Sequence, residues 1–460
     1  MSVFRLARQS VALVVLVLCC GTAPAWAQSV LSLPPNVLLP NNESLPVGAV
    51  AGLEGNAFAA RANDSTAPWF NPAGLARSTQ SSASVSAGAF RFLSVLPEGT
   101  TGSGGGTQQI PAAVGVVVKN AFHTTSWTVG LSVIRTAAWS QETDSEVFGI
   151  APVPSRTAFS ADSSFDRTTV GVSAGWTDGA SLRLGASLLG DVLSLRSVTM
   201  ASVRQQPSPT SVDTAIGSNR ITGSQGMLRL GLGAQLDASP SIKLGLAVRT
   251  PGVQILPGAS YAADGAVMSG GASAQASFLD SETMKFRYKL PFETALGVAW
   301  VTKRVEVELD LKWQSAVAAY PGFSSPASMY YLSDPGDGTP VVITKSPFPD
   351  RVFALQSTWN VSLGGRVALD DKGTWQLHGG FATDRSPVAP ADSFFSRVDL
   401  YSATIGVSGE AFHIAGSLGL TYQFGSSGER TVPILGGTEV TVSKYTISNI
   451  GILYSASYKF

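Results

Sequence analysis

The chain has 460 residues, with 31 basic and 31 acidic side chains, and only 13% of its residues are charged. That share is about half of the charge that soluble globular proteins carry, and the even balance gives no indication of nucleic-acid binding. Glycine is abundant, with 48 residues. Low charge and high glycine favour a membrane β-barrel, and a secreted β-sandwich or β-helix is the alternative.

The first 27 residues have the layout of a secretory signal peptide. Arg5 and Arg8 precede an apolar run from Val11 to Cys20, and Ala25-Trp26-Ala27 forms a cleavage site of the A-x-A type. The run is too short for a transmembrane helix, which needs about 20 apolar residues. A lipoprotein signal is the rival, but Cys20 follows another cysteine rather than a small residue. We therefore expect a signal peptide over 1–27, cleaved after Ala27.

Cys19 and Cys20 both lie in this leader, so the mature chain is expected to have no disulfide, no thiolate nucleophile and no cysteine-based metal site. The histidines are His123, His378 and His413, which stand on different segments without metal-ligand spacing. An outer-membrane phospholipase would need a Ser/His constellation, for which the sequence gives little support. The sequence thus predicts no metal, no cofactor and no enzyme activity.

Residues 28–78 lack the alternation of apolar and polar residues that predicts strands. Up to Val50 the chain is interrupted by prolines, and Gly55 to Arg77 is rich in Ala, Asn and Pro. Pro72 fixes its own φ and pushes Asn71 toward an extended conformation, so we expect a sharp turn that ends a short helix begun near Asp64 or Ser65. A free periplasmic tail should be polar, whereas this segment contains four large apolar side chains: Phe58, Trp69, Phe70 and Leu75.

From residue 79 to residue 460 the sequence consists of segments in which apolar and polar residues alternate. In Val305–Trp313 the odd positions are apolar, and the even positions are Glu306, Glu308, Asp310 and Lys312. Such a split suits a strand with one face in lipid and one in a wet lumen. The fourteen predicted strands lie near 79–95, 111–120, 125–136, 166–177, 181–196, 221–237, 241–250, 284–301, 304–316, 353–369, 374–384, 397–409, 411–424 and 446–460.

The connectors between these segments alternate between short and long, as periplasmic turns and extracellular loops do in outer-membrane barrels. The long ones are predicted at 96–110, 137–165, 197–220, 251–283, 317–352, 385–396 and 425–445. The last strand ends on Phe460, with Tyr458 on the same face. A terminal aromatic resembles the signal by which barrel-assembly machinery recognises outer-membrane proteins. The sequence therefore predicts a transmembrane antiparallel β-barrel of about fourteen strands in a bacterial outer membrane, surrounded by its lipids and lipopolysaccharide.

A barrel of about eight strands fills itself with side chains, whereas one of sixteen or more encloses an aqueous channel. Fourteen strands leave a lumen that needs a constriction or a plug. Residues 28–78 have the right size for a plug, so we predict a hatch in that segment.

The stretch from Asn56 to Leu75, with Trp69-Phe70-Asn71-Pro72-Ala73 at its centre, resembles the hatch of the FadL/TodX family of outer-membrane transporters. The likeness in length, strand number and terminal aromatic covers the mature chain. It implies a monomeric barrel for passive uptake of long-chain fatty acids or other hydrophobic compounds such as aromatic hydrocarbons. It also implies gating by a hatch at Asn71, Pro72, Ala73 and Phe70. About twenty residues before the hatch have no counterpart in the family pattern.

The resemblance further implies lateral release of ligand through a gap at a kinked third strand, here 125–136. Gly130 lies in its middle and is the candidate kink, although glycine also serves simply as a small lumen residue. Ligand contacts are predicted at Phe58, Trp69, Arg135 and Arg366, with apolar capture patches at Val253–Pro257 and Phe348. No motif marks a carboxylate-binding site; basic residues of inward parity are Arg135, Arg183, Arg229, Lys243, Arg249 and Arg366.

Two functions of other classes remain open from the sequence. The barrel could serve as a protein-secretion or surface-anchoring partner whose loops bind a polypeptide. It could also be a porin for polar solutes, in which residues 28–76 would be peripheral to the conduction path.

Overall fold

A computed structural model of the protein describes residues 37–38, 41, 45–97, 104–149, 155–208, 211–269, 272–392, 394–427, 430–434, 438–442 and 445–460. The predicted leader, residues 1–27, lies outside these ranges. Within the described ranges, no helix combines the length and apolar character needed to cross a bilayer.

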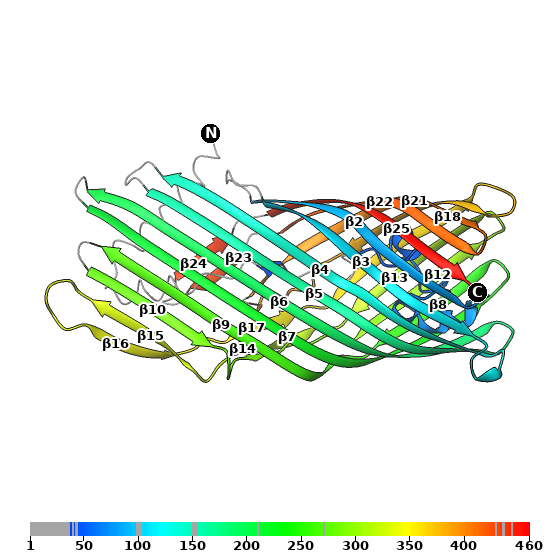
Figure 1. The fold of residues 1–460 in the computed structure, drawn as a ribbon, viewed down its shortest axis with the longest axis horizontal. Coiled ribbons are helices and arrows are strands. Elements are labelled where there is room, and N and C mark those ends of the chain that lie inside the picture. Colours follow the sequence, from blue (N-terminus) through cyan, green and yellow to red (C-terminus); the bar gives the residue numbers. More distant parts are fainter. Residues whose placement is uncertain are drawn as a thin grey trace.

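Fourteen antiparallel strands form a closed barrel, in which the last strand pairs with the first (Figure 1). Each strand pairs with its neighbours in chain order, so the wall is a simple meander. The wall strands are β2 (Ser82–Pro97), β3 (Gly104–Lys119), β4 (Trp127–Gly149), β5 (Ser155–Thr177), β6 (Leu182–Ser208), β7 (Ser211–Asp237), β8 (Ile242–Arg249), β12 (Glu293–Val301), β13 (Val305–Gln314), β18 (Thr358–Ala368), β19 (Trp375–Asp384), β21 (Val398–Ala411), β22 (Ile414–Ser427) and β25 (Tyr445–Lys459).

The fourteen predicted strands are confirmed, but several predicted long loops are wrong. Segments 137–165 and 197–220 continue as β4–β5 and β6–β7, which stay paired as far as Gly149–Ser155 and Ser208–Ser211. The start of the segment predicted at 284–301 is also wrong, because β12 begins only at Glu293. Alternation reveals a strand where one face lies in lipid. Beyond the bilayer that requirement ends, so polar strand extensions read as loops.

The end with the long connections carries additional strands. The hairpins β9 (Val253–Ser269) with β10 (Ala272–Asp280), and β15 (Ser328–Asp334) with β16 (Val342–Pro347), extend the wall beside β7. Short strands lie apart from the wall: β11 (Lys285–Phe286), β14 (Val317–Ser324) and β17 (Arg351–Leu355) form one sheet, β23 (Arg430–Ile434) pairs with β24 (Thr438–Val442), and β1 (Val37–Leu38) pairs with β20 (Phe395–Ser396).

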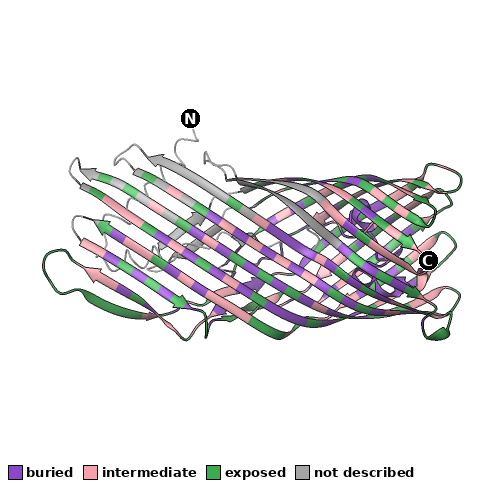
Figure 2. Ribbon diagram, in the orientation of Figure 1, coloured by how far each residue is buried: buried purple, intermediate pink, exposed green. Residues whose placement is uncertain are grey.

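Burial alternates along the wall strands, as Figure 2 shows. In β13, Leu309 and Leu311 are 51% and 39% exposed on the outside, whereas Glu308 and Asp310 are fully buried in the lumen. The predicted separation of an apolar outer face and a charged inner face on this strand is therefore confirmed. A continuous band of exposed leucine, valine and isoleucine is unfavourable in water and suits the hydrocarbon of a bilayer.

The short-turn end of the barrel carries exposed aromatic side chains, among them Trp127, Trp300 and Trp375. The C-terminus lies at this end (Figure 1), where Tyr458 stacks on Phe460 and the Phe460 N–H donates to the Ser81 carbonyl. This placement matches an interfacial girdle. The role of Phe460 and Tyr458 as an insertion signal stays a prediction.

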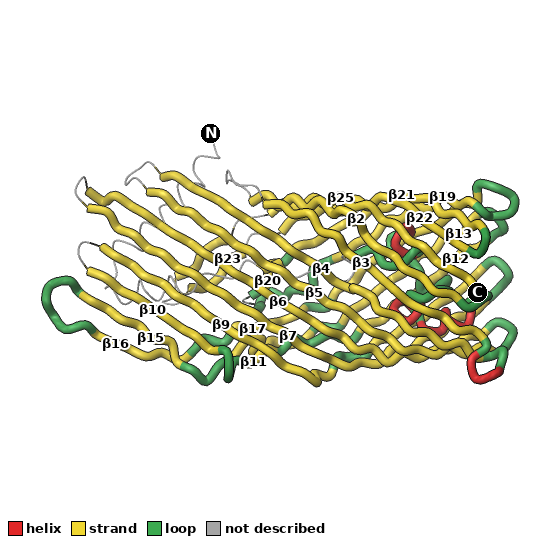
Figure 3. The backbone as a smooth tube through the Cα atoms, viewed as in Figure 1, coloured by secondary structure: helices red, strands yellow, loops and turns green. Residues whose placement is uncertain are grey.

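Residues 45–78 form a compact hatch inside the lumen at the short-turn end, where Figure 3 shows the short helices enclosed by strands. It contains η1 (Ala51–Glu54), α3 (Ala67–Phe70) and η2 (Pro72–Arg77). Asn71 is extended, with φ −162° and ψ 106°, as predicted for a residue before proline. The helix starts after Thr66 rather than at Asp64, whose carboxylate accepts the Thr66 N–H. Pro72 then begins the second turn, where its missing N–H is harmless.

Wall glycines allow the hatch backbone to approach the strands closely. A Cβ at Gly233 would overlap the Asn71 Oδ1, and a Cβ at Gly245 would overlap the Ala59 carbonyl. At Gly231, two residues from Gly233 on the same face, a Cβ would meet only ordinary contacts, the nearest being Ser187 Cβ at 3.4 Å. Some inward glycines therefore seat the hatch, while others only line the lumen.

We predict that Gly233→Ala weakens the seating of the hatch by about 1–3 kcal/mol, because the new methyl group displaces Asn71. Limited proteolysis of the purified barrel should then cleave within residues 45–78 faster than in the wild type. Gly231→Ala is the matched control and should leave cleavage unchanged. Equal cleavage of the two variants would contradict the assignment.

Candidate functional site

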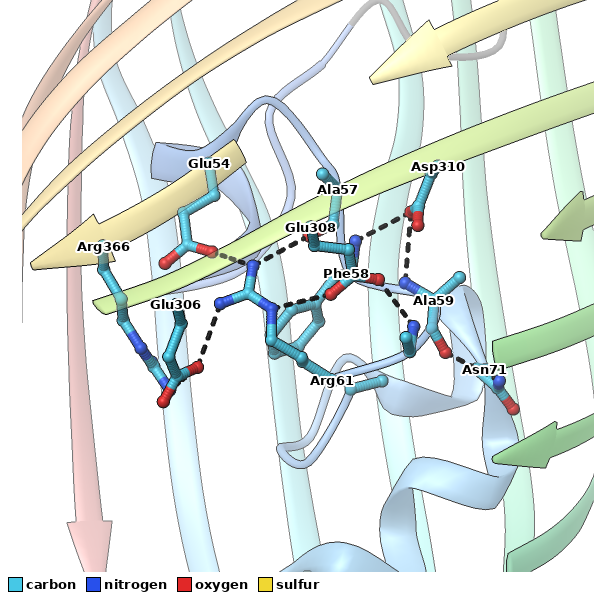
Figure 4. A network of polar contacts seen from close by, with 12 residues as sticks. Glu54, Ala57, Phe58, Ala59, Arg61, Asn71, Glu306, Glu308, Asp310 and Arg366 are labelled. Carbon is cyan, nitrogen blue, oxygen red and sulfur yellow. Dashed lines mark hydrogen bonds and ion pairs between the residues drawn. The ribbon is translucent and has the colours of Figure 1, made fainter. Parts of the chain in front are cut away.

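Arg61 is the centre of the polar contacts between the hatch and the wall (Figure 4). Its guanidinium pairs with Glu54 of the hatch, with Glu308 of β13 at 2.7 Å and with Glu306 of β13 at 3.1 Å. Arg366 of β18 joins the group through Glu306 at 2.8 Å. Arg61, Glu54 and Glu308 are almost fully buried. Breaking such a buried pair leaves an uncompensated charge, so the network fixes the hatch in one position.

The surroundings of Glu54 keep it ionised. Burial alone raises the pKa of its carboxyl, but the hydrogen bond with His378 and the charge of Arg61 outweigh burial and hold the pKa below its usual range. His378 Nδ1 lies 2.8 Å from Glu54 Oε1, and its Nε2 lies 2.8 Å from Ser408 Oγ. Likewise, the three carboxylates outweigh burial and raise the pKa of Arg61. The contact is thus a true ion pair at neutral pH.

Carboxylates of β13 also accept hydrogen bonds from the hatch backbone. Asp310 Oδ2 accepts the N–H groups of Phe58 and Ala59 at 2.8 and 3.1 Å, and Glu308 Oε1 accepts that of Ala60 at 2.6 Å. These three consecutive N–H groups lie in an irregular turn. Buried N–H groups need an acceptor, and the wall supplies it here.

Asn71 holds the turn predicted to shape the hatch. Its Oδ1 accepts the Ala73 N–H at 3.1 Å, while its Nδ2 donates to the carbonyls of Ala59 at 2.8 Å and of Ala234, on β7, at 3.0 Å. Pro72 and Ala73 lie against Gly185 of the wall. The Asn-Pro-Ala motif therefore joins two hatch segments to the barrel.

Trp69 faces a group of arginines from three wall strands. The guanidinium carbons of Arg249, Arg229 and Arg167 lie 3.9, 5.2 and 5.7 Å from its ring centre. Cation–π attraction stabilises such stacking. Arg229 pairs with Asp191 at 2.8 Å, and Glu293 pairs with Arg249 at 2.6 Å and with Arg229 at 3.3 Å. We call Trp69, these three arginines, Asp191 and Glu293 the Trp69 cluster.

A buried aromatic cluster occupies the long-loop half of the lumen. Phe353 lies 4.8 Å from Phe395 and 5.3 Å from Phe394, and Phe395 reaches Tyr288 and the wall residue Phe165 at 6.3 and 6.4 Å. Its side chains come from the wall and from segments that fold inward between wall strands. We call it the aromatic chamber; its aromatic members are Trp139, Phe165, Tyr261, Phe278, Phe286, Tyr288, Tyr320, Phe323, Tyr331, Phe348, Phe353, Phe394 and Phe395.

The predicted ligand residues fall in different places. Phe58 packs edge-to-face on Phe70 at 5.8 Å inside the hatch core. Arg366 belongs to the Arg61 network, and Arg135 pairs with Asp166. Trp69 borders the arginine cluster. None of these four predicted ligand residues belongs to the aromatic chamber.

Of the two predicted capture patches, Phe348 lies in the chamber, stacked on Phe278 at 4.8 Å. Val253–Pro257 is not a loop patch: it is part of β9, paired with β7, with Val253 and Leu256 exposed. The alternation along the strands correctly predicted that Arg229 and Arg249 face the lumen. It did not single out Arg167, and it did not predict which carboxylates pair with these arginines.

The third wall strand, β4, is irregular, although not at Gly130. Gly130 pairs in register with Val117 of β3 and Ser173 of β5, and its open side receives Leu75 of the hatch. The predicted kink at Gly130 is therefore wrong. The register shift between β4 and β5 lies between Arg135 and Ala137, which leaves Thr136 as a bulge.

The ladder between β3 and β4 is interrupted beside this bulge. Within the described residues of both strands, the pair after Ala113–Ile134 is Gly104–Thr143. The register of the two strands is the same on both sides of this interval. The strands part over eight residues each and rejoin without slipping. We refer to this interval as the wall break.

In the part of the chain that the structure describes, no group of three His, Cys, Asp or Glu side chains is arranged to hold a metal ion.

No protein-family model and no curated protein matches this sequence. Solved structures do match its fold. A Pseudomonas aeruginosa FadL homologue is 14% identical with a TM-score of 0.58, over 92% of this chain and 100% of that one. The Pseudomonas putida toluene transporter TodX is 16% identical with a TM-score of 0.56, over 90% and 99%. The Ralstonia pickettii toluene transporter TbuX is 14% identical with a TM-score of 0.53, over 90% and 99%. The chain thus has the fold of these barrels.

We predict that acid loosens the hatch. Because the pKa of Glu54 is lowered in the folded protein, its stabilisation is complete above the usual value of about 4.3 and is lost as the pH falls through the lower folded value. The conductance of single barrels in planar bilayers should therefore stay constant from pH 7 down to about 4.3 and rise as the pH falls further. In Glu54→Gln the conductance should already be raised at pH 7.

Asp371→Asn is the control, because Asp371 forms an ion pair with Arg304 that is exposed to solvent. It should reproduce the wild-type pH profile. A wild-type conductance that stays constant down to pH 3 would contradict the ionic seating of the hatch.

Proposed function

We propose that this chain is a member of the FadL/TodX family and acts as an outer-membrane channel for hydrophobic small molecules. The observation that carries the proposal is a sealed hatch beneath a buried aromatic chamber, next to a break in the barrel wall. The fold match to a FadL homologue and to two toluene transporters supports it. The signal peptide predicted at residues 1–27 is consistent with export to that membrane.

Capture of cargo is assigned to the aromatic chamber. Its side chains bury a large apolar area at the long-loop end, so a hydrophobic molecule gains free energy by leaving water there. Several of the rings come from inward-folded segments rather than from the wall, such as Phe395 of β20 and Phe394 just before it. These segments can repack around cargo without opening the barrel.

The Trp69 cluster suits cargo that carries a carboxylate. Phe165 of the chamber and Arg167 of the cluster are neighbours on the same face of β5, so the two sites adjoin. Guanidinium groups bind carboxylates through charge-assisted hydrogen bonds, so the arginines are the groups here that suit a carboxylate. A long-chain fatty acid fits both sites, with its chain among the rings and its carboxylate at the arginines.

The wall break is the proposed route of lateral release. Ala137 and Trp139 lie on β4 within the break and belong to the chamber. An apolar molecule can pass from these side chains to the lipid without crossing the charged hatch. Passive flow down the concentration gradient needs no energy-coupling site.

The hatch keeps polar solutes out while cargo leaves sideways. Ionic and backbone contacts with β13 hold it in the lumen below the chamber. This arrangement does not favour an open porin for polar solutes, and no described feature favours a polypeptide partner. We propose that Asn71, Pro72, Ala73 and Phe70 shape the hatch and that its movement adjusts access to the break.

Blocking the chamber side of the wall break should stop uptake. In Ala137→Trp the indole enlarges a side chain that packs in the chamber beside the break, and proteoliposome uptake of a fluorescent long-chain fatty acid should fall to the level of vesicles without protein. Ala174→Trp, at a partly exposed position on the adjacent strand β5, should transport normally. Heat-modifiable migration on gels verifies that both barrels are folded. Normal uptake by folded Ala137→Trp would refute the lateral route, and absence of uptake by the wild type would refute the function.

Removing one cation should change cargo preference. Arg167→Met removes one guanidinium of the Trp69 cluster, so fatty-acid uptake should fall by roughly tenfold, the effect of one charge-assisted hydrogen bond. Uptake of toluene should be unchanged. Arg304→Met, whose ion pair with Asp371 is exposed to solvent, is the control and should affect neither cargo. Equal losses of both cargoes in Arg167→Met would contradict the carboxylate assignment.

A further inference from the structure

The outer face of the barrel wall is hollow where two glycines meet. Gly365 of β18 and Gly379 of β19 are direct cross-strand partners. Val307 of β13 and Ile405 of β21 continue the same row on either side. Side chains two residues apart on a strand share a face, and Val307 lies two residues from the lipid-facing Leu309, so the whole row faces the bilayer.

Large apolar side chains surround the two glycines. Along the strands, Leu363 lies opposite Phe381 on one side of the pair, and Val367 lies opposite Leu377 on the other. These four side chains are between 41% and 48% exposed on the outside of the barrel. They border a groove of about 490 Å³, a volume within the range of small-molecule sites. We call this hollow the glycine groove.

The packing of the protein itself does not require glycine at position 379. Its φ is not positive, and apart from its chain neighbours a Cβ there would have only the Thr404 carbonyl oxygen, at 3.9 Å, within 4 Å. At Gly365, in contrast, a Cβ would lie 2.4 Å from the Glu306 carbonyl oxygen. Glycine weakens a strand interior, and it often marks a place where another molecule approaches closely. Gly379 therefore points to an occupant of the groove.

The surroundings of the groove select a hydrocarbon chain as this occupant. The groove lies within the band of exposed leucine, valine and isoleucine that suits the core of a bilayer. Carbon atoms that border an unfilled hollow lose dispersion contacts. A flexible acyl chain can fill an irregular apolar groove, and acyl chains are what the bilayer core offers.

Basic side chains lie where the headgroup of the same lipid would be. The turn that carries Lys303 and the turn that carries Lys372 lie side by side, because Arg304 pairs with Asp371. Both lysines are exposed, and neither has a carboxylate partner among the described residues. From Val307 in the groove to Lys303 the strand covers roughly 13 Å. A lipid with one chain in the groove can therefore place its phosphate at these lysines.

The wall is thin at the groove because its inner face also lacks side chains there. Gly364 and Gly380 are cross-strand partners that face the lumen, and a Cβ on either would overlap the backbone of Glu54 in the hatch. Only one layer of backbone thus separates the groove from the hatch. A chain bound outside supplies packing contacts that the wall itself lacks at this point.

We propose that the glycine groove binds one phospholipid of the leaflet at the short-turn end. One acyl chain lies over Gly365 and Gly379, and the anionic headgroup lies at Lys303 and Lys372. The lipid acts as a structural ligand that supports the wall outside the hatch. This assignment goes beyond the proposed transport function and does not depend on which molecules the barrel carries.

Native mass spectrometry of the full-length barrel in detergent tests the site. Titrated with dioleoylphosphatidylglycerol, the wild type should retain one lipid per chain. Gly379→Leu fills the groove, so its affinity for the lipid should fall by roughly tenfold, the effect of losing about ten carbon–carbon contacts. Gly190→Leu is the control, because Gly190 is an outward glycine of β6 whose Cβ would meet only ordinary contacts. It should retain the lipid.

The headgroup is tested by Lys303→Gln and Lys372→Gln. Each should weaken lipid binding by roughly fivefold, the effect of one basic side chain near an anionic membrane surface. Lys119→Gln, at the short-turn end of β3 on the far side of the barrel, should bind the lipid as the wild type does. Heat-modifiable migration verifies that every variant is folded.

Thermal unfolding gives an independent readout. The lipid should raise the temperature at which the wild type loses its heat-modifiable migration, because it binds the folded state, and it should not do so for Gly379→Leu. A wild type that retains no lipid, or equal retention by folded Gly379→Leu, would overturn the proposal. So would a lipid-free dimer of the wild type that Gly379→Leu abolishes, since the groove would then be an interface between two copies of the chain.

Discussion

The position of the hatch depends on the carboxylates of one wall strand. Glu308 and Asp310 alternate with lipid-facing leucines on β13, so the strand that anchors the hatch is also a typical membrane strand. A carboxylate buried in the lumen needs a partner, and Arg61 with three hatch N–H groups provides it. Neither part satisfies its polar groups alone. The barrel wall and the hatch therefore depend on each other to pair their buried charges and N–H groups.

Much of the wall could be predicted from the sequence because lipid imposes a period of two on every strand that crosses it. The inward position of Glu308 and Asp310 followed directly from that period. The strand extensions beyond the bilayer could not be predicted, since water accepts polar side chains on both faces. The turn at Asn71-Pro72 was predictable for a different reason: proline restricts the backbone locally, whatever surrounds it.

The contacts across the lumen were beyond the reach of the sequence. Parity shows that Arg229 and Arg249 point inward, but it does not show that both meet Trp69, about 160 and 180 residues earlier in the chain. Those partners depend on the shape of the closed barrel. Gly130 failed as a kink for a related reason. A strand glycine permits a bulge, a close contact or nothing, and only the neighbouring Leu75 shows which of these applies.

The order of strands has a consequence for assembly. The hatch leads directly into β2, and β2 is the strand on which β25, the last to be synthesised, closes the cylinder. The seam of the barrel is therefore adjacent to its plug. The hatch also packs directly on wall glycines such as Gly233 and Gly245, where a Cβ would overlap it. We therefore expect the barrel to close around a hatch that already lies in its lumen.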